Sequence, residues 1–240
     1  MKQTSAKYSR DYGYLRVASA VPLVNVADVT FNSEQVLSCV REAVSHRAQM
    51  LVLPELALTG YTCADLFGND ALLDEVECAI ERINAALVDY PSLLLVVGAP
   101  LRDNGHLFNC AVVMQNGRMW VVPKTYLPNY KEFYEKRWFT SDNITRGSLS
   151  EITVGNHRVP FGTDLLFEAG KVKVAVEVCE DLWVPIPPSS LAAINGANVL
   201  VNISASNEVV GKHDYLVDLI KHQSDHSIAA YVYSSAGFGE

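Results

Sequence analysis

The sequence predicts an α/β fold with a mixed sheet, and three observations support this prediction. Strand-like apolar segments alternate with helix-like amphipathic segments along most of the 240 residues. Short, continuously apolar runs such as 93–100 are typical of strands that are buried on both faces. Asn116-Gly117 separates the apolar runs 108–114 and 119–122 and predicts a tight antiparallel hairpin, because both turn residues tolerate positive φ.

The first half of the chain alternates strands with helices. Its predicted strands are residues 14–21, 50–55 and 93–100. Asn32 or Ser33 is the predicted N-cap of the first helix, since a short polar side chain can accept a hydrogen bond from the first turn. This helix is predicted to run to about residue 46, with valines at a spacing of four on one face. A second helix is predicted over residues 72–88.

The second half repeats the alternation after a long polar segment. Residues 127–162 carry proline, glycine, asparagine and many charges, and this pattern predicts an irregular functional loop. The strands predicted beyond the loop are residues 171–179, 198–204 and 228–234. The helices predicted between these strands are residues 189–195 and 212–225. The whole pattern is βαβα with at least one antiparallel hairpin, and it contains no internal repeat.

Composition and charge describe one globular domain over residues 1–240. Hydrophobic residues make up 49% of the chain and charged residues 19%, which is ordinary for a folded protein. The net charge of -8 argues against nucleic acid or an anionic membrane as a partner. No apolar run approaches the ~18 residues that a membrane span requires.

The cysteines and the N-terminal residues predict a cytoplasmic protein. The 5 cysteines include no C-x-x-C pair, and their odd number favours a reducing compartment over a disulfide framework. Residues 1–14 lack the apolar segment of a signal peptide. Cys39 and Cys78 fall within helical patterns and are predicted to be core residues.

Three reactive side chains stand at the ends of apolar strands: Glu55, Lys124 and Cys179. The ends of strands in α/β sheets are common ligand sites. Taken singly, such a cysteine is more often a buried hydrophobe, and such a lysine is usually a solvated loop charge. Glu55 is flanked by apolar residues, and a buried carboxylate requires a partner.

Together the three side chains suit acyl transfer from an amide. A cysteine nucleophile must lose its proton to attack, and a partly buried carboxylate can accept that proton. An ammonium group beside the carbonyl oxygen can stabilise the oxyanion. The sequence therefore predicts a cysteine amide hydrolase with Glu55, Lys124 and Cys179 as its catalytic triad.

The segments around these residues resemble a known superfamily. "LVLPELALTGY", "VPKTYLPNYKEFYEKRWF" and "VEVCEDLW", in this order, are similar to the motifs of the nitrilase, or carbon–nitrogen hydrolase, superfamily. The flanks, with "SSAGFGE" near residue 240, resemble the glutaminase domains of glutamine-dependent NAD synthetases. The resemblance implies a four-layer αββα sandwich that hydrolyses glutamine to glutamate and ammonia through a cysteine thioester. It also implies that the ammonia passes to a synthetase domain, which amidates deamido-NAD with ATP and magnesium.

The resemblance also implies roles for individual residues. Glu55 would be the general base, Lys124 the oxyanion stabiliser and Cys179 the nucleophile, with the backbone N–H of Glu180 as a second oxyanion donor. The residues implied for the glutamine pocket are Tyr130, Glu135, Glu180, Trp183, Ser206 and Lys212. Lys212 departs from the family pattern, in which an arginine is expected. The glutaminase domain itself needs no cofactor or metal, and a homo-oligomer is expected.

Family members continue beyond the position of Glu240, through further strands and then a synthetase domain. We therefore expect residues 1–240 to be a hydrolase domain truncated at its C-terminal end, without a synthetase domain. Two other functions stay open: a stand-alone amidase or carbamoylase for another small amide, and a non-catalytic interaction module that has kept the fold.

Two further patterns lie outside these motifs. His222 and His226 have a metal-binding spacing on a predicted helix, but a solvated helix face explains them better. Glu177 is expected to pair with a basic group and, by strand alternation, to share a face with Cys179.

Overall fold

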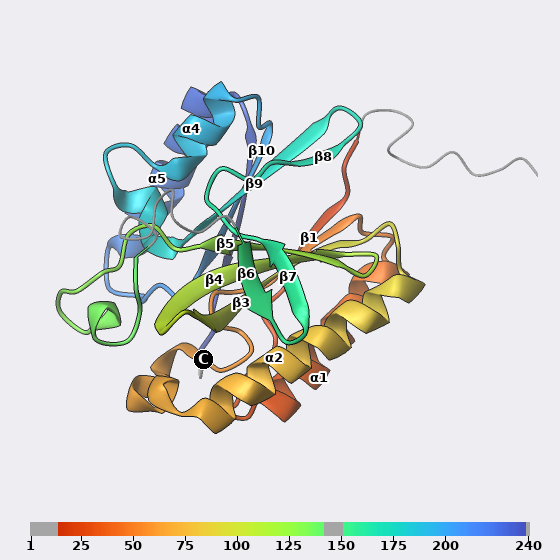
Figure 1. The fold of residues 1–240 in the computed structure, drawn as a ribbon. Helices are drawn as coiled ribbons and strands as arrows, with labels where there is room; N and C mark the ends of the chain where they lie inside the picture. Colours follow the sequence, from red (N-terminus) through yellow and green to blue (C-terminus); the bar gives the residue numbers. More distant parts are fainter. Residues whose placement is uncertain (1–13, 142–150, 239–240) are drawn as a thin grey trace, which may run out of the picture.

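Five strands form the first sheet, in the order β1-β2-β3-β4-β5 (Figure 1). They belong to a computed structural model that describes residues 14–141 and 151–238. The strands are β1 (Val17–Ser19), β2 (Met50–Val52), β3 (Leu94–Asp103), β4 (His106–Gln115) and β5 (Arg118–Pro123). β1, β2 and β3 are parallel, whereas β4 and β5 pair in antiparallel fashion. Asn116 and Gly117 both have positive φ between β4 and β5, which confirms the predicted hairpin.

Four strands form the second sheet, in the order β11-β10-β9-β8. They are β8 (Phe167–Ala169), β9 (Val172–Val178), β10 (Val199–Ser204) and β11 (Ala230–Ser235). β9, β10 and β11 are parallel, as their apolar runs predict, and β8 pairs with β9 in antiparallel fashion. β8 was not predicted, because its three partly or fully exposed residues show no apolar pattern.

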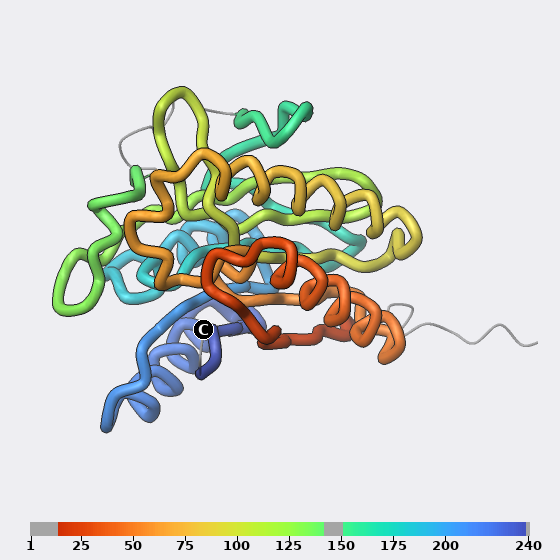
Figure 2. Tube along the Cα trace, turned by 90° about the horizontal axis from the view of Figure 1, so that it is seen from below, coloured from red at the N-terminus to blue at the C-terminus, as the bar shows by residue number. Residues whose placement is uncertain are grey.

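The elements stack in four layers, helices outside and sheets inside (Figure 1). α1 (Val29–Ser45) and α2 (Asp70–Ala86) cover the outer face of the first sheet, and Figure 2 shows them side by side. α4 (Pro188–Ile194) and α5 (Lys212–Ser227) cover the second sheet. An apolar core from both sheets fills the space between them, with Val52, Val96, Val113, Val176 and Val201 among its members. The αββα architecture is therefore confirmed.

The first helix begins earlier than the sequence predicts. Asp28 is the N-cap of α1, and its carboxylate accepts a hydrogen bond from the backbone N–H of Phe31. Asn32 and Ser33 lie inside the helix and are fully buried, so the predicted N-cap is wrong. Asn32 instead ties the helix to neighbouring loops, because its side-chain amide donates to the carbonyl oxygens of Asn25 and Leu58.

The polar segment 127–162 is more regular than predicted, although residues 142–150 lie outside the described parts. It contains a short 3₁₀ helix, Glu135–Arg137, and a hairpin formed by β6 (Glu151–Val154) and β7 (His157–Pro160). Every second residue of β6 is buried in the core beside α2, which explains why so polar a segment forms a strand.

Two smaller findings concern the cysteines of α1 and α2 and the apolar character of the helices. Cys78 is exposed on α2, so the prediction that it is a core residue is wrong, whereas Cys39 is partly buried and packs against the core. Cys39 falls at the edge of the buried stripe of α1, whereas Cys78 lies on the side of α2 opposite the buried stripe. Within residues 14–141 and 151–238, no helix combines the length and the apolar character that a membrane crossing would demand.

Candidate active site

Glu55, Lys124 and Cys179 lie just beyond strands of the two facing sheets, as predicted. Lys124 directly follows β5 and Cys179 directly follows β9, whereas Glu55 lies in a turn shortly after β2. Gly98 of β3 supports this turn, because a Cβ at residue 98 would lie 2.2 Å from the backbone nitrogen of Leu56. The missing side chain therefore allows the turn that carries Glu55 to rest directly on β3.

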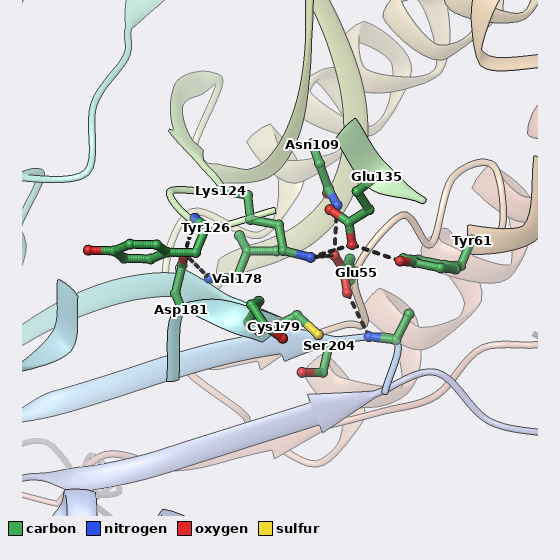
Figure 3. A network of polar contacts seen from close by, with 12 residues as sticks. Glu55, Tyr61, Asn109, Lys124, Tyr126, Glu135, Val178, Cys179, Asp181 and Ser204 are labelled. Atoms are coloured by element: carbon green, nitrogen blue, oxygen red, sulfur yellow. Dashed lines mark hydrogen bonds and ion pairs between the residues drawn. The ribbon is translucent and has the colours of Figure 1, made fainter. Parts of the chain in front are cut away.

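A buried cluster of charges forms around Lys124 (Figure 3). Its Nζ atom lies 2.7 Å from Oε1 of Glu55 and 2.6 Å from Oε1 of Glu135. All three side chains are buried. Burial acts to lower the pKa of Lys124, but the charges of Glu135 and Glu55 outweigh it and raise that pKa well above its ordinary value. Lys124 is therefore a permanent cation and not a base.

Glu55 is oriented by three donors. Its Oε1 atom accepts hydrogen bonds from Nδ2 of Asn109, at 2.6 Å, and from Nζ of Lys124. Its Oε2 atom accepts a 2.8 Å hydrogen bond from the backbone N–H of Ala205, which follows β10 of the second sheet. The carboxylate is thus held between the two sheets.

The backbone changes conformation at Cys179, directly after β9. β9 ends at Val178, and Cys179 begins the 3₁₀ helix Cys179–Trp183 with a left-handed φ of 47°. Left-handed backbone at a residue other than glycine costs roughly 1–3 kcal/mol and persists only where its surroundings hold it. The turn brings the thiol to the face of Val178, between the sheets, where its sulfur faces the Glu55–Lys124 pair (Figure 3).

Both expectations for Glu177 are wrong. Because of the turn at Cys179, Glu177 and Cys179 lie on opposite faces of the second sheet. Glu177 is buried and accepts hydrogen bonds from the backbone N–H of Ser189, at 2.9 Å, and from the hydroxyl of Tyr231. These neutral donors take the place of the expected basic group, and burial raises the pKa of Glu177.

The side chain of Cys179 is a neutral thiol. Burial raises the pKa of Cys179 to about 12, and the charge of Glu55 acts in the same direction. The charge of Lys124 and a hydrogen bond with Ser204 oppose these effects without cancelling them. A thiol with this pKa must lose its proton as it attacks, and Glu55 offers a carboxylate for that proton.

The residues predicted to bind substrate form two groups around Cys179. In the first group, the hydroxyl of Tyr130 donates to Oε2 of Glu180 at 3.0 Å. In the second group, Nζ of Lys212 donates to Oγ of Ser206 at 2.6 Å and lies 5.3 Å from the ring centre of Trp183. Burial raises the pKa of Glu180, and the charges of Lys124 and Lys212 act in the opposite direction, so both lysines lie within electrostatic reach of Glu180.

Glu135 lies deeper than a residue of an open pocket. Its Oε1 atom binds Lys124 and accepts a 2.7 Å hydrogen bond from the hydroxyl of Tyr61. Its Oε2 atom is buried and has no hydrogen-bond partner within the described residues. That oxygen can therefore accept a hydrogen bond from a bound amide, so contact between Glu135 and substrate stays a prediction.

Three residues that hold the site were not predicted: Tyr61, Asn109 and Asp181. Tyr61 and Asn109 donate to the two glutamates of the buried cluster. Asp181 is buried and binds backbone N–H groups on both sides of the site. Tyr61 and Asp181 lie inside the sequence motifs that surround Glu55 and Cys179, so their motif positions were the available signal.

A groove that is separate from these residues lies elsewhere among the described residues. It has a volume of about 800 Å³ and includes Arg102, Arg137 and Trp138, but none of the predicted site residues. Arg102 is already paired there with Asp70 and Glu77. No group of three or more potential metal ligands occurs among residues 14–141 and 151–238. Burial and complementary charge, rather than cavity size, therefore locate the candidate active site.

Comparisons with known proteins find similar sequences along almost the whole chain. Residues 16–239 match the family model described as carbon-nitrogen hydrolase. The chain is 41% identical over 233 residues to the glutamine-dependent NAD(+) synthetase of Mycobacterium tuberculosis strain H37Rv, a match that covers 95% of this chain and 34% of that protein. Its identity to the protein of the same name from Mycobacterium leprae is 39% over 236 residues, covering 97% of this chain and 34% of that protein. The chain thus spans about a third of the length of these relatives.

Solved structures show the same fold. A glutamine-dependent NAD(+) synthetase from Cytophaga hutchinsonii superposes with a TM-score of 0.79 at 29% identity, over 92% of this chain and 36% of that one. An amidase from Nesterenkonia sp. superposes with a TM-score of 0.74 over 92% of this chain and 76% of that one. Its identity is only 17%, so this likeness concerns the fold alone.

Proposed function

The chain belongs to the carbon–nitrogen hydrolase family, and from this premise we propose that it hydrolyses the side-chain amide of glutamine to glutamate and ammonia. One observation carries the proposal: the sulfur of Cys179 faces a buried cluster in which Lys124 is bound by both Glu55 and Glu135 (Figure 3). Such a cluster supplies a base and a permanent cation beside one nucleophile.

The reaction begins with attack by sulfur. Glu55 takes the thiol proton as the sulfur of Cys179 bonds to the amide carbon, and the electron pair of the carbonyl moves onto its oxygen. Lys124 and the backbone N–H of Glu180 stabilise this oxyanion. Glu55 then returns the proton to the nitrogen as the carbon–nitrogen bond breaks, which releases ammonia and leaves a thioester. Water, activated by Glu55, hydrolyses the thioester to glutamate and the free thiol.

Two opposite charges in the site suit an amino-acid substrate. Glu180, hydrogen-bonded by Tyr130, can bind the α-ammonium group of glutamine. Lys212, held against Ser206 and Trp183, can bind the α-carboxylate. Lys212 is a compact charge without the two-pronged geometry of the arginine expected at this position. A neutral amide would use neither charge.

We further propose that the ammonia passes to a synthetase domain, where ATP and magnesium support amidation of deamido-NAD. The names of the relatives support this step, and the chain spans only about a third of their length. Cytoplasmic location, self-association, the domain boundary and the absence of a nucleic-acid partner stay predictions from the sequence.

The test is ammonia release from a panel of substrates. Glutamine, asparagine, simple aliphatic amides, N-carbamoyl amino acids and nitriles would be compared for the wild type and for Cys179→Ala. We expect glutamine to be the best substrate and Cys179→Ala to retain less than a few per cent of the activity. Cys78→Ser, which changes an exposed cysteine, is the matched control and should leave activity unchanged. A better rate with a neutral amide would favour the stand-alone amidase instead.

A further inference from the structure

The nucleophile and the oxyanion cation come from different sheets. Cys179 follows β9 of the second sheet, and Lys124 follows β5 of the first. Within the described residues these two sheets share no ladder, and they meet mainly through apolar side chains, with Glu55 as one polar link between Lys124 and Ala205. Apolar contact is not directional, so it does not by itself fix the position of Cys179 relative to Lys124.

One buried carboxylate bridges the two strand ends (Figure 3). Oδ1 of Asp181 accepts hydrogen bonds from the backbone N–H groups of Tyr126, at 2.8 Å, and Thr125, at 3.1 Å, which directly follow Lys124. Oδ2 of Asp181 accepts a 3.0 Å hydrogen bond from the backbone N–H of Val178, which directly precedes Cys179. Asp181 is 1% exposed, so water does not compete for these bonds.

We propose that Asp181 is a positioning residue whose carboxylate fastens the turn at Cys179 to the strand end at Lys124, and so sets the geometry between nucleophile and oxyanion cation. Three directional hydrogen bonds meet on the two oxygens of one carboxylate, which leaves little freedom to either strand end. The hydrogen bond from Val178 also restrains the residue that directly precedes the left-handed backbone of Cys179. Burial and the charge of Glu177 raise the pKa of Asp181 above its ordinary value, and the hydrogen bonds from the amides of Val178 and Tyr126 limit this rise.

The proposal rests on the proposed function, because it concerns the same site. It predicts an effect that loss of stability alone would not give. Amide hydrolysis needs the thiol of Cys179 and the ammonium group of Lys124 at a defined distance and orientation. Alkylation of the thiol by iodoacetamide needs no oxyanion cation. Loosening the bridge should therefore slow hydrolysis much more than alkylation.

Asp181→Asn is the direct test, in the full chain. The amide keeps the shape of the carboxylate but places an NH₂ group against one set of backbone N–H donors. We expect kcat for the best amide substrate to fall about 10- to 100-fold, with KM within about twofold, because misplacement of a reacting group by ~1 Å has effects of this size. The alkylation rate of Cys179 should change less than about threefold.

Glu177→Gln is the matched control. Glu177 is also a buried carboxylate near the end of β9, but its donors, Ser189 and Tyr231, lie on the outer face. Glu177→Gln should change the melting temperature without separating hydrolysis from alkylation. Equal losses of hydrolysis and alkylation in Asp181→Asn, or unchanged hydrolysis in a folded variant, would overturn the proposal.

Amide hydrogen exchange in the wild type tests the bridge even if Asp181→Asn does not fold. The amides of Thr125, Tyr126 and Val178 should be strongly protected and should exchange at similar rates, because one opening would release all three. Exchange of Tyr126 as fast as an exposed loop amide would overturn the proposal. A wild type that hydrolyses no amide but shows this protection would refute the proposed function and leave the bridge intact.

Discussion

Replacing Gly98 by alanine should displace Glu55, the predicted general base, without changing Glu55 itself. A Cβ at residue 98 would lie 2.2 Å from the backbone nitrogen of Leu56, and ordinary contact begins at 3.4 Å. The turn that carries Glu55 or β3 must therefore move by about 1.2 Å, the difference between these distances. The turn cannot easily lift away, because Gly98 N donates to Pro54 O at 3.1 Å and Leu58 N donates to Gly98 O at 3.3 Å.

The expected cost follows from this displacement. A misplacement of ~1 Å lowers catalytic rates about 100-fold, which corresponds to about 2.7 kcal/mol in the activation free energy. Overpacking a buried site also lowers the free energy of unfolding, by about 1–3 kcal/mol. We therefore expect Gly98→Ala to fold with a lower melting temperature and to release ammonia from glutamine about 100-fold more slowly, when assayed well below that temperature.

Gly68→Ala is the matched control for this variant. A Cβ at residue 68 would meet no atom within 4 Å, so the same substitution should leave both activity and melting temperature nearly unchanged. Activity of Gly98→Ala within threefold of the wild type would refute the reasoning, because Glu55 would then not depend on close approach to β3. An equal loss in Gly68→Ala would show that the assay reports general damage.

Three other predictions concern the same cluster. Glu55→Gln and Cys179→Ala should each abolish turnover, and the double variant should be no slower, because members of one catalytic unit are not additive; multiplicative losses would contradict this. Asn109→Ala removes one donor to Glu55 and should lower kcat by about tenfold, less than Glu55→Gln, in the same ammonia assay. The folded chain holds the thiol proton of Cys179 up to a pKa of about 12, and the unfolded chain releases it near 9.0. The free energy of unfolding should therefore fall as pH rises above 9.0, by about 2 kcal/mol at pH 10.5. In denaturant titrations at pH 9.0 and 10.5, Cys179→Ala should lack this part of the loss.

Sequence patterns predicted that Glu55, Lys124 and Cys179 come together, because each stands at or shortly after the end of an apolar strand, and the structure brings these strand ends together. They could not show which residues hold the triad in place. Tyr61, Asn109 and Asp181 bind partners that are 74, 54 and 56 residues away along the chain, and local periodicity does not report such contacts. The left-handed backbone at Cys179 was equally hidden, since a cysteine gives no sign of positive φ, whereas Gly117 does. That one turn reversed the expected face of Cys179 relative to Glu177.

Covalent labelling by a glutamine analogue tests the central claim most directly. The analogue carries a chloroketone in place of the side-chain amide, and the labelled peptide is identified by mass spectrometry after digestion. We expect about one label per chain, on Cys179, and protection from labelling by glutamine, because the buried thiol reacts only where Glu55 and Lys124 activate a bound substrate. Labelling that instead follows exposure, with Cys78 modified first and glutamine without effect, would contradict the assignment of Cys179 as the nucleophile of a glutaminase.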